Sequence, residues 1–418
     1  MNRIPSGKLE SIIWTQAKIV LLCLRQKTMA RPTVLSTFTG PGGLDLGLER
    51  AHFRVAGCIE IDPLVQETLR KNRPTWPVLE PGDIRAQADR LKPKDLGLRR
   101  RELGLLVGGP PCQPFSKAAQ WAKNGRSGLT DNRADGLRAF LRIVEVFLPQ
   151  AILIENVPGF VQGETNAVPF LERELDRINR RERTRYGLEA KVLDAAGYGV
   201  PQRRRRAIVI VFRNGQSFEW PVPTHHDKPV RAWDAIGGLS CRKVPPAKGY
   251  WAGLLPSIPE GQNYLWHTRR NGGERLFGYR TRYWSFLLKL AKNQPSWTLS
   301  AHPGPATGPF HWKNRPLTVK EMLRLQSFPA TWHVAGEYRH QVFQVGNATP
   351  PLLGEVLGRA IASQLFGAHF EGPPTLRIAR KRSVPQPERV RRVPERYLRH
   401  RGPHADHPGP GQGPGSRT

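Results

Sequence analysis

The stretch Gly108-Gly109-Pro110-Pro111-Cys112-Gln113-Pro114-Phe115-Ser116 decides how the fold of this chain is interpreted. It follows Leu105-Leu106-Val107, a short apolar run that predicts a buried strand. Glycine is conformationally free and proline lacks an N–H group, so the strand must end there in a rigid turn. In open α/β sheets the carboxyl edge of the strands is where ligands bind. We therefore expect Cys112 to be presented at that edge as a nucleophile.

A second interpretation of Cys112 is a buried thiol that packs as a small apolar side chain, the commoner fate of a single intracellular cysteine. The two glycines and two prolines before it make this alternative less favourable. The chain has three further cysteines, Cys23, Cys58 and Cys241, and no Cys-x-x-Cys pair. This scatter predicts neither a disulfide framework nor a metal site, and it suits a reducing cytoplasm.

The composition predicts a protein of two domains with a polyanionic partner. The chain has 418 residues, which exceeds the usual size of a single core. Lys and Arg number 65 and Asp and Glu 34, so the formal net charge is +31. A charge of this size favours nucleic acid as the partner, although basic tails on an ordinary enzyme would account for part of it. The apolar run at residues 19–24 is too short to span a bilayer, so we expect a soluble protein.

The N-terminal part predicts a strand–turn–helix unit that binds an anion or a nucleotide. A strand at residues 34–38 runs into the glycine turn at 39–43, and an amphipathic helix is expected from about 44 to 51. Such a turn at a helix N-terminus is a binding device for phosphates and nucleotides. A second strand at residues 54–59 ends in Glu60, at the distance from the glycines where an acidic side chain meets ribose hydroxyls.

The glycine turn also indicates which nucleotide is bound. Asp45 occupies the third glycine position of the dinucleotide fingerprint, so the turn lacks a glycine that a bound pyrophosphate would require. An adenosine without phosphates fits this turn better, and we expect S-adenosylmethionine. The alternatives for the turn taken alone are a nicotinamide site and an ordinary tight turn.

Glu155 follows the next buried strand, predicted at residues 151–154. A carboxylate at the tip of this strand, beside the strand that delivers Cys112, would reach the same bound ring. The alternative is a surface or helix-capping glutamate, which is common.

Four consecutive arginines, residues 203–206, adjoin the strongly apolar strand predicted at residues 207–212. Such a run usually marks a solvated face. The pleat of a strand sends alternate side chains to opposite sides, so Arg204 and Arg206 are expected to share one side. Two forked guanidinium groups there suit a phosphate or a base carbonyl.

Two segments lack regular periodicity. Residues 116–132 are rich in Lys, Gly, Ser and Arg and predict a mobile loop over the site. From residue 213 to about 315, aromatic residues alternate with basic ones among many prolines and glycines. Cations beside flat aromatic side chains are what contact with DNA requires. The alternative is a small satellite core around Trp284, Phe286 and Leu287 with a basic exterior, and we expect both to hold for different residues.

Taken together and in this order, the motifs resemble the DNA (cytosine-5)-methyltransferase family of the bacterial restriction–modification type. Pro110-Pro111-Cys112-Gln113 comes closest to deciding this by itself, and the ordered set is highly specific. The resemblance covers about residues 34–365, and the matching segments are 38–43, 60–62, 82–84, 110–116, 155–157, 202–206, 315–321, 325–329 and 346–348. It implies an α/β fold: a Rossmann-like domain dependent on S-adenosylmethionine with a smaller, irregular target-recognition domain.

The resemblance implies four catalytic residues. Cys112 resembles the thiolate that attacks C6 of the target cytosine, and Glu155 the acid that protonates or hydrogen-bonds N3. Arg206 resembles the residue that holds the cytosine O2, and Arg204 would support the site. Addition of a thiolate at C6 turns C5 into a nucleophilic carbon that can accept a methyl group, after which loss of the C5 proton expels the enzyme. The base must be flipped out of the duplex for this chemistry.

The resemblance also implies binding residues. Phe38 is expected against the adenine ring, Glu60 on the ribose hydroxyls and Asp83 on the adenine amino group. The cofactor-binding set is Phe38, Gly40, Gly42, Gly43, Glu60, Ile61, Asp83, Pro111 and Asn347. The DNA-binding set is Gln113, Ser116, Arg269, Arg270, Arg280 and Arg282. Ser36 departs from the pattern, because the family usually has an acidic residue there.

The resemblance and the sequence character of the two ends divide the chain into parts. Residues 1–30 are expected to be an N-terminal extension, with a native start at Met29 left open. The expected parts that follow are a catalytic and cofactor-binding domain at 31–213, a target-recognition domain at 214–325, a return to the catalytic domain at 326–370 and a disordered basic tail at 371–418.

The expected partner is double-stranded DNA, methylated by a monomer in the bacterial cytoplasm that associates with the nucleoid through DNA. We expect functional pairing with a restriction endonuclease without a stable complex. An RNA cytosine-5 methyltransferase is an alternative that the long aromatic and basic segment disfavours. A non-catalytic DNA-binding protein is another, which the presence of Cys112, Glu155 and Arg206 disfavours. A nicotinamide oxidoreductase is the least favoured.

Overall fold

The computed structural model describes residues 31–111, 135–164, 166–241, 244–269, 271–278 and 283–402. In this part of the chain six strands form one sheet in the order β2-β1-β3-β4-β7-β5. The strands are β1 (Thr33–Thr37), β2 (Arg54–Ile59), β3 (Leu105–Gly108), β4 (Ala151–Asn156), β5 (Gly187–Asp194) and β7 (Arg205–Phe212). Strands β1 to β4 pair in parallel, and β7 is antiparallel to both of its neighbours. Four parallel strands therefore end at one edge.

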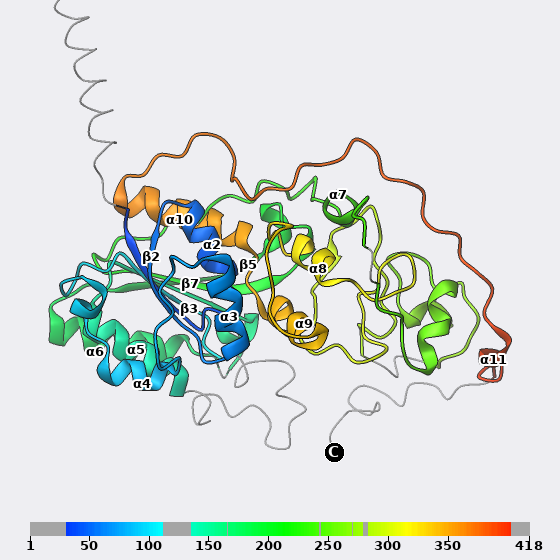
Figure 1. The fold of residues 1–418 in the computed structure, drawn as a ribbon, viewed down its shortest axis with the longest axis horizontal. Helices are drawn as coiled ribbons and strands as arrows, with labels where there is room; N and C mark the ends of the chain where they lie inside the picture. Colours follow the sequence, from blue (N-terminus) through cyan, green and yellow to red (C-terminus); the bar gives the residue numbers. More distant parts are fainter. Residues whose placement is uncertain are drawn as a thin grey trace, which may run out of the picture.

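Helices cover both faces of this sheet (Figure 1). Two of them, α2 (Gly43–Arg50) and α10 (Pro351–Phe366), pack on one face. The other face carries α4 (Ile84–Arg90), α5 (Asp135–Phe147) and α6 (Val168–Glu182). We call the sheet with these helices the sheet unit. The arrangement confirms the expected α/β fold class.

Strand β3 shows why the apolar runs of the sequence become central strands. Leu105 and Val107 pack into the core beneath α2 and α10, whereas Leu106 packs into the core beneath α5 and α6. Side chains of a strand alternate between its faces, so a strand covered on both faces needs an unbroken apolar run. The predicted strands at residues 34–38, 54–59, 105–107, 151–154 and 207–212 all lie in this sheet.

The remaining helices and strands of the described residues have ten residues or fewer. They are α3 (Pro63–Asn72), β6 (Gln202–Arg203), α7 (Ala232–Ile236), β8 (Ser296–Trp297), α8 (Val319–Leu325), α9 (Tyr338–Asn347) and α11 (Glu395–Leu398). Short 3₁₀ segments occur at Pro93–Leu96, Pro158–Phe160, Ala195–Tyr198, Tyr250–Ser257 and Tyr264–His267. Helix α8 has a reciprocal cap, because Thr318 N donates to Glu321 Oε2 and Glu321 N donates to Thr318 Oγ1. Among the described residues, no helix combines the length and apolar character that crossing a membrane requires.

Residues 250–310, which we call the distal unit, are irregular and lie on the right of Figure 1. Their hydrophobic cluster includes Leu254, Tyr264, Phe286 and Leu287. The expected satellite core is thus present. Trp284, however, is 44% exposed and belongs to the surface of this unit.

The expectation of a disordered tail from residue 371 is wrong for residues 371–402. Ile378 is buried in the core of the sheet unit, and Tyr397 is buried in the cluster of the distal unit. This segment is held by isolated apolar side chains and hydrogen bonds, which leave no periodic pattern in the sequence. Residues 403–418, like the extension at 1–30, lie outside the described residues.

Candidate active site

The candidate site lies at the edge where β1, β3 and β4 end together. Gly108 at the end of β3 is in register with Thr37 of β1 and with Ile154 of β4. The turn that follows β3 and the Glu155 side chain on β4 therefore start from adjacent positions. A methyl group placed on Gly109 would lie 3.5 Å from Oε2 of Glu155.

Cys112 and its neighbours Gln113 and Ser116 lie outside the described residues, as does the loop expected at residues 116–132. The described chain reaches Pro111. Asn156 donates a buried hydrogen bond of 2.9 Å from Nδ2 to the carbonyl oxygen of Pro110. Its own Oδ1 accepts from the N–H of Val157. Asn156 therefore positions the turn two residues before Cys112, a role that its place beside Glu155 indicated but that was not assigned from the sequence.

Glu155 and Arg206 form a close ion pair. Nε of Arg206 lies 2.7 Å from Oε1 of Glu155, and the two side chains are 14% and 11% exposed. The pair forms because β4 and β7 are antiparallel neighbours with Glu155 opposite Ile208, two residues from Arg206. Burial of both charges makes the contact strong and its loss costly. A carboxylate and a guanidinium thus share one place at the carboxyl edge.

The four arginines separate instead of lining one face. Arg204 is 1% exposed, its backbone N–H donates to Asp194, and its Nη2 donates to the carbonyl oxygen of Asn347. Arg204 lies between β6 and β7 and belongs to neither strand. The alternation of side chains along a strand, on which the expected common side of Arg204 and Arg206 was based, therefore does not apply to it. Arg205 is exposed on β7.

Arg203 belongs to a feature that sequence reasoning missed. Its guanidinium lies 5.0 Å from the ring centre of Trp297, and the Trp297 ring lies 5.6 Å from that of Trp284 in an edge-on arrangement. Pairing of β6 with β8 places Arg203 opposite Trp297. We call these three residues the Arg–Trp ladder. It starts three residues from Arg206 and ends on an exposed ring of the distal unit. The mixture of aromatic and basic residues in the sequence was its only signal.

The glycine turn after β1 is built around Glu60. Oε2 of Glu60 accepts from the N–H of Gly40 at 2.8 Å, and Oε1 accepts from the N–H of Asp62 at 3.0 Å. The side chain is buried, and burial raises the pKa of Glu60. Gly42, at a φ of 82°, caps the N-terminus of α2 in the left-handed region that favours glycine. One carboxylate oxygen of Glu60 thus holds the glycine turn, and the other holds the segment after β2.

Phe38 leaves β1 with a φ of 52°, an uncommon conformation for a residue with a side chain. A β-carbon on Gly136 would lie 3.1 Å from the Phe38 ring and 3.3 Å from Pro111. The rings of Phe38 and Pro111 therefore approach each other beside the start of α5. Ile61 is 63% exposed after the end of β2. Apolar groups thus border the turn.

Asp83 caps α4 and follows Gly82, which lies against Glu60. Oδ1 of Asp83 accepts from the N–H of Arg85, and the Arg85 guanidinium, at 2.8 Å from Oδ2, lowers the pKa of Asp83. A β-carbon on Gly82 would collide with the carbonyl oxygen of Glu60 at 2.0 Å. The chain before Asp83 therefore passes directly against Glu60.

Asn347 is exposed at the end of α9, where a turn reaches back to the sheet unit. A β-carbon on Gly43 would lie 2.1 Å from the carbonyl oxygen of Thr349, so glycine is required for this close approach. Trp332 also reaches back and donates from its indole N–H to the carbonyl oxygen of Pro41 at 3.1 Å. The glycine turn is therefore held from the C-terminal side.

Asp45 is a buried carboxylate on α2. Burial raises its pKa to about 6, and a contact with Ser36 offsets part of this rise. Ser36 is the position where the sequence departs from the resemblance, so the acidic group of this region stands on the helix instead of the strand.

Arg269 is exposed on the distal unit, whereas Arg270, Arg280 and Arg282 lie outside the described residues. Among the described residues, no cluster of three or more His, Cys, Asp and Glu side chains could hold a metal ion.

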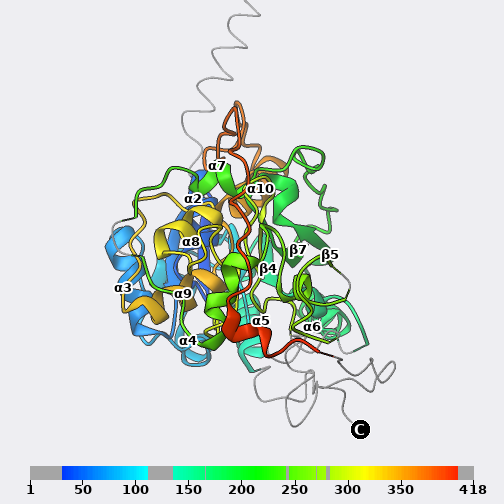
Figure 2. The same cartoon turned by 90° about the vertical axis from the view of Figure 1, so that its right-hand side faces the viewer.

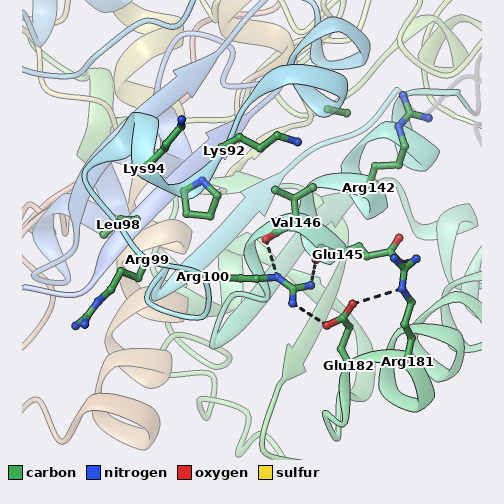
Figure 3. Close-up of a pocket in the computed structure, with 12 residues that line it drawn as sticks. Lys92, Lys94, Leu98, Arg99, Arg100, Arg142, Glu145, Val146, Arg181 and Glu182 are labelled. Carbon is green, nitrogen blue, oxygen red and sulfur yellow. Dashed lines mark hydrogen bonds and ion pairs between the residues drawn. The ribbon is translucent and has the colours of Figure 1, made fainter.

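A cavity of about 770 Å³ lies away from this site (Figure 3). Its lining comes from the segment before β3 and the last turns of α5 and α6, at the amino edge of the sheet. Arg100 pairs with Glu182 and Arg181 with Glu145, each at 2.8 Å. These two ion pairs lie on the side of the sheet opposite Glu155, and Lys92 and Lys94 also line the cavity.

Comparison with known proteins gives one consistent result. A family model described as C-5 cytosine-specific DNA methylase matches residues 33–363. The chain is 36% identical to the Type II methyltransferase M.SacI of Streptomyces achromogenes, over 79% of this chain and 93% of that protein. It is 32% identical to the Type II methyltransferase M.Eco47II of Escherichia coli, over 80% of this chain and 79% of that protein.

Solved structures show the same fold at low sequence identity. The structure of the Entamoeba histolytica methyltransferase EhMeth matches with a TM-score of 0.55 and 16% identity, and it covers 81% of this chain and 99% of that one. A variant of DNMT2 from Spodoptera frugiperda matches with a TM-score of 0.56 and 14% identity, covering 79% and 99%. These likenesses show the fold over about four fifths of the chain.

Proposed function

This chain belongs to the C-5 cytosine-specific DNA methylase family, and from that membership we propose how its residues carry out the reaction. The protein is a DNA methyltransferase that transfers a methyl group from S-adenosylmethionine to carbon 5 of cytosine. The observation that carries the proposal is the Glu155–Arg206 pair beside the turn that leads to Cys112.

The residues around the glycine turn fit the cofactor. Each carboxylate oxygen of Glu60 accepts one backbone N–H and keeps a further lone pair, which suits two ribose hydroxyls. The Phe38 and Ile61 side chains offer apolar surface for adenine, and Asp83 follows Gly82, whose backbone lies against Glu60. We assign Gly40, Gly42, Gly43, Pro111 and Asn347 to the remaining walls. When bound, S-adenosylmethionine supplies an electrophilic methyl group on its sulfonium sulfur.

The catalytic roles follow from the chemistry of cytosine. The Cys112 thiolate forms a bond to C6, and the electron pair of the C5–C6 bond makes C5 nucleophilic. Glu155 holds a proton at N3, which stabilises the ring as this electron density shifts. After C5 has gained the methyl group, loss of its proton restores the double bond and breaks the bond between sulfur and C6.

Arg206 orients Glu155 and offers its remaining N–H groups to the cytosine O2. Arg204 acts at a distance, because its buried side chain links the start of β7 to the end of α9. Its role is to hold the two halves of the site together. These assignments make Arg206 a catalytic residue and Arg204 a positioning residue.

We assign DNA contact to the face of the distal unit that continues from the site. The Arg–Trp ladder leads from the carboxyl edge of the sheet to the exposed ring of Trp284. Aromatic rings stack on bases, and arginine pairs with phosphates. Arg269 adds positive charge to this unit, and we keep Gln113, Ser116, Arg270, Arg280 and Arg282 in the DNA-binding set from the sequence.

We propose functional pairing with a restriction endonuclease, which the similarity to Type II methyltransferases supports. We also propose that the protein acts as a cytoplasmic monomer on nucleoid DNA. We keep the division into a catalytic domain at 31–213, a recognition domain at 214–325 and a returning segment at 326–370. The hydrogen bond from Trp332 to the carbonyl oxygen of Pro41 supports that return.

Bisulfite sequencing of DNA from Escherichia coli expressing the protein tests the function, with the empty vector as control. We expect unconverted cytosines in one short sequence context, because the distal unit selects the site. In parallel, purified protein is offered labelled cofactor with duplex DNA or with tRNA. Label in tRNA and none in any DNA would contradict the proposal.

A further inference from the structure

Residues 371–402, which we call the strap, run along the molecule from the sheet unit to the distal unit. In Figure 1 the strap leaves α10, passes over α7 and ends at α11 on the far side of the distal unit. Figure 2 shows its red end crossing in front of that unit. The strap carries ten Lys or Arg and three Glu, and five prolines make much of it stiff.

The first anchor of the strap lies on the sheet unit. The fully buried carboxylate of Glu355 on α10 accepts from the N–H groups of Thr375 and Leu376 at 2.6 and 2.9 Å. Arg359 pairs with Glu355 at 2.8 Å, so the buried charge is balanced. Ile378 then packs in the large hydrophobic cluster that includes the core of the sheet unit. The start of the strap is thus fixed by two backbone hydrogen bonds and one apolar side chain.

The second anchor lies on α7. Oδ1 of Asp234 accepts from the N–H of Lys381 at 2.9 Å, and Arg231 donates to the carbonyl oxygen of Lys381 at 2.7 Å. Arg231 and Asp234 themselves pair at 2.7 Å, with Asp234 buried. The Lys381 ammonium lies 5.3 Å from the ring centre of Trp233. Both the backbone N–H and the backbone carbonyl group of Lys381 are therefore hydrogen-bonded to side chains at the start of α7.

The third anchor is a buried lysine in the distal unit. Nζ of Lys292 lies 2.7 Å from Glu260 and 2.9 Å from Glu388 of the strap. Glu388 also donates its N–H to Glu260 at 2.8 Å, and Lys292 donates to the carbonyl oxygen of Gln386 at 3.0 Å. Lys292 is 4% exposed, so the two carboxylates neutralise a charge that burial would otherwise make unfavourable.

The fourth anchor completes the core of the distal unit. Tyr397 is 0% exposed, its hydroxyl donates to the carbonyl oxygen of Tyr250 at 2.6 Å, and its ring stacks on Trp251. Gly253 has no side chain where one would overlap Arg396 and Tyr397. Beyond it, Arg401 pairs with Glu274. The core of the distal unit is therefore incomplete without a residue from the end of the strap.

We propose that the strap positions the distal unit on the sheet unit and so sets the DNA-contacting face in register with Glu155. The β6–β8 pairing joins the units through Gln202 with Ser296 and Arg203 with Trp297, and Leu290 and Leu299 of the distal unit share a hydrophobic cluster with the sheet unit. The cluster around Tyr264 and Phe286 is separate from that shared core, so the part of the distal unit that it holds can move relative to the sheet unit. A stiff segment bonded to both restrains that motion. This inference rests on the proposed role of the distal unit in binding DNA.

Two truncated chains test the strap. One ends at Phe370 and lacks the strap, and its matched control ends at Gly402 and keeps all four anchors. We expect the chain that ends at Phe370 to show a KM for DNA raised about tenfold or more and a kcat within about twofold. Affinity for S-adenosylhomocysteine, measured by calorimetry, stays within about twofold because the glycine turn is remote from the strap. The chain that ends at Gly402 matches the full chain.

A pair of point variants covers the case in which the shorter chain does not fold. Tyr397→Ala removes the ring from the distal core, whereas Tyr397→Phe keeps the ring and loses the hydrogen bond. We expect Tyr397→Ala to raise the KM for DNA and Tyr397→Phe to restore most of the native value. Equal KM values for Tyr397→Ala and the native protein would overturn the proposal.

Hydrogen exchange without DNA separates this inference from the proposed function. We expect amides of residues 250–268 to exchange faster in the chain ending at Phe370 and in Tyr397→Ala, with the sheet unchanged. If the amides of residues 250–268 exchange at an unchanged rate, the proposal that the strap holds the distal unit is wrong, whatever the KM for DNA. Faster exchange with an unchanged KM overturns its positioning role. A full chain that methylates no DNA overturns the proposed function, while the exchange result still decides the strap.

Discussion

The sheet unit and the distal unit place their functional groups by different physical means. In the sheet unit, parallel register brings Gly109 and Glu155 together, and antiparallel pairing with β7 adds Arg206. Each position follows from hydrogen bonds repeated along a strand. The distal unit has an irregular backbone around an aromatic cluster, and Tyr397 completes that cluster from a remote part of the chain.

This difference indicates which task each unit is suited to. A site built on strand ends is held rigidly, which suits chemistry that depends on distances between reacting atoms. A surface built on loops tolerates substitution, which suits the selection of different DNA sequences. Variants in the two units should therefore fail in different ways, in turnover for the sheet unit and in DNA affinity for the distal unit.

The largest effect is expected from Glu155→Gln. The amide keeps the shape but cannot hold a proton at N3 in the same way, so kcat should fall about 100- to 10,000-fold. DNA affinity in a filter-binding assay should change little. Glu172→Gln, on the exposed surface of α6, is the matched control and should keep native kcat. Native turnover by Glu155→Gln would remove the carboxyl group from the mechanism.

The next effect concerns the buried Asp45 and is one of stability. Its folded pKa of about 6 lies above the ordinary value of 3.8, so this group makes the fold less stable as pH rises from about 4 to about 6. Asp45→Asn abolishes that loss and should stabilise the protein at pH 8 by up to about 3 kcal/mol. At pH 4 the two proteins should have nearly equal stability. Urea unfolding at both pH values measures this, and a gain that is equal at both would contradict the assignment.

Arg206→Ala is expected to lower kcat about 10- to 100-fold, because Glu155 loses its partner and its orientation. Arg205→Ala is the matched control, since Arg205 is exposed on the same strand. Steady-state kinetics with saturating DNA make the comparison. An equal fall in kcat in the two variants would show that the positive charge of residues 203–206 matters and that the pairing of Arg206 with Glu155 does not.

The smallest of these effects is expected from Trp284→Ala in the distal unit. Loss of a stacking ring should weaken DNA binding about tenfold and leave kcat within about twofold. Val222→Ala, at another strongly exposed apolar residue, should leave both unchanged. A lower kcat with native affinity would place Trp284 in the chemistry and weaken the contrast between the two units.

The sequence predicted the sheet unit well because burial on both faces leaves a strong pattern. The strand before Cys112 and the strand that ends at Glu155 were predicted, and so was their meeting at one edge. Strand β5 was not, because it lies at the edge of the sheet and its charged side chains, such as Glu189 and Lys191, break the apolar run. The contact of Asn156 with Pro110 depends on local geometry, which has no signature in composition.

The distal unit and the strap were predicted less well for a physical reason. Their stability comes from single anchors, such as Tyr397 and Lys292, spaced without a period among prolines and arginines. Such a segment has the composition of a disordered chain, and its order depends on partners far away in the sequence. The Arg–Trp ladder likewise arises from the pairing of β6 with β8.

The most direct test of the account is covalent trapping on duplex DNA that carries 5-fluorocytosine at the methylated position. Release of the enzyme requires that the C5 hydrogen be lost as a proton. Fluorine cannot be lost as a cation, so the bond between sulfur and C6 should persist after methyl transfer. We predict a stable complex of protein and DNA whose peptide map places the adduct on Cys112. An adduct on another residue, or methylation of ordinary DNA by Cys112→Ser at the native rate, would contradict the account.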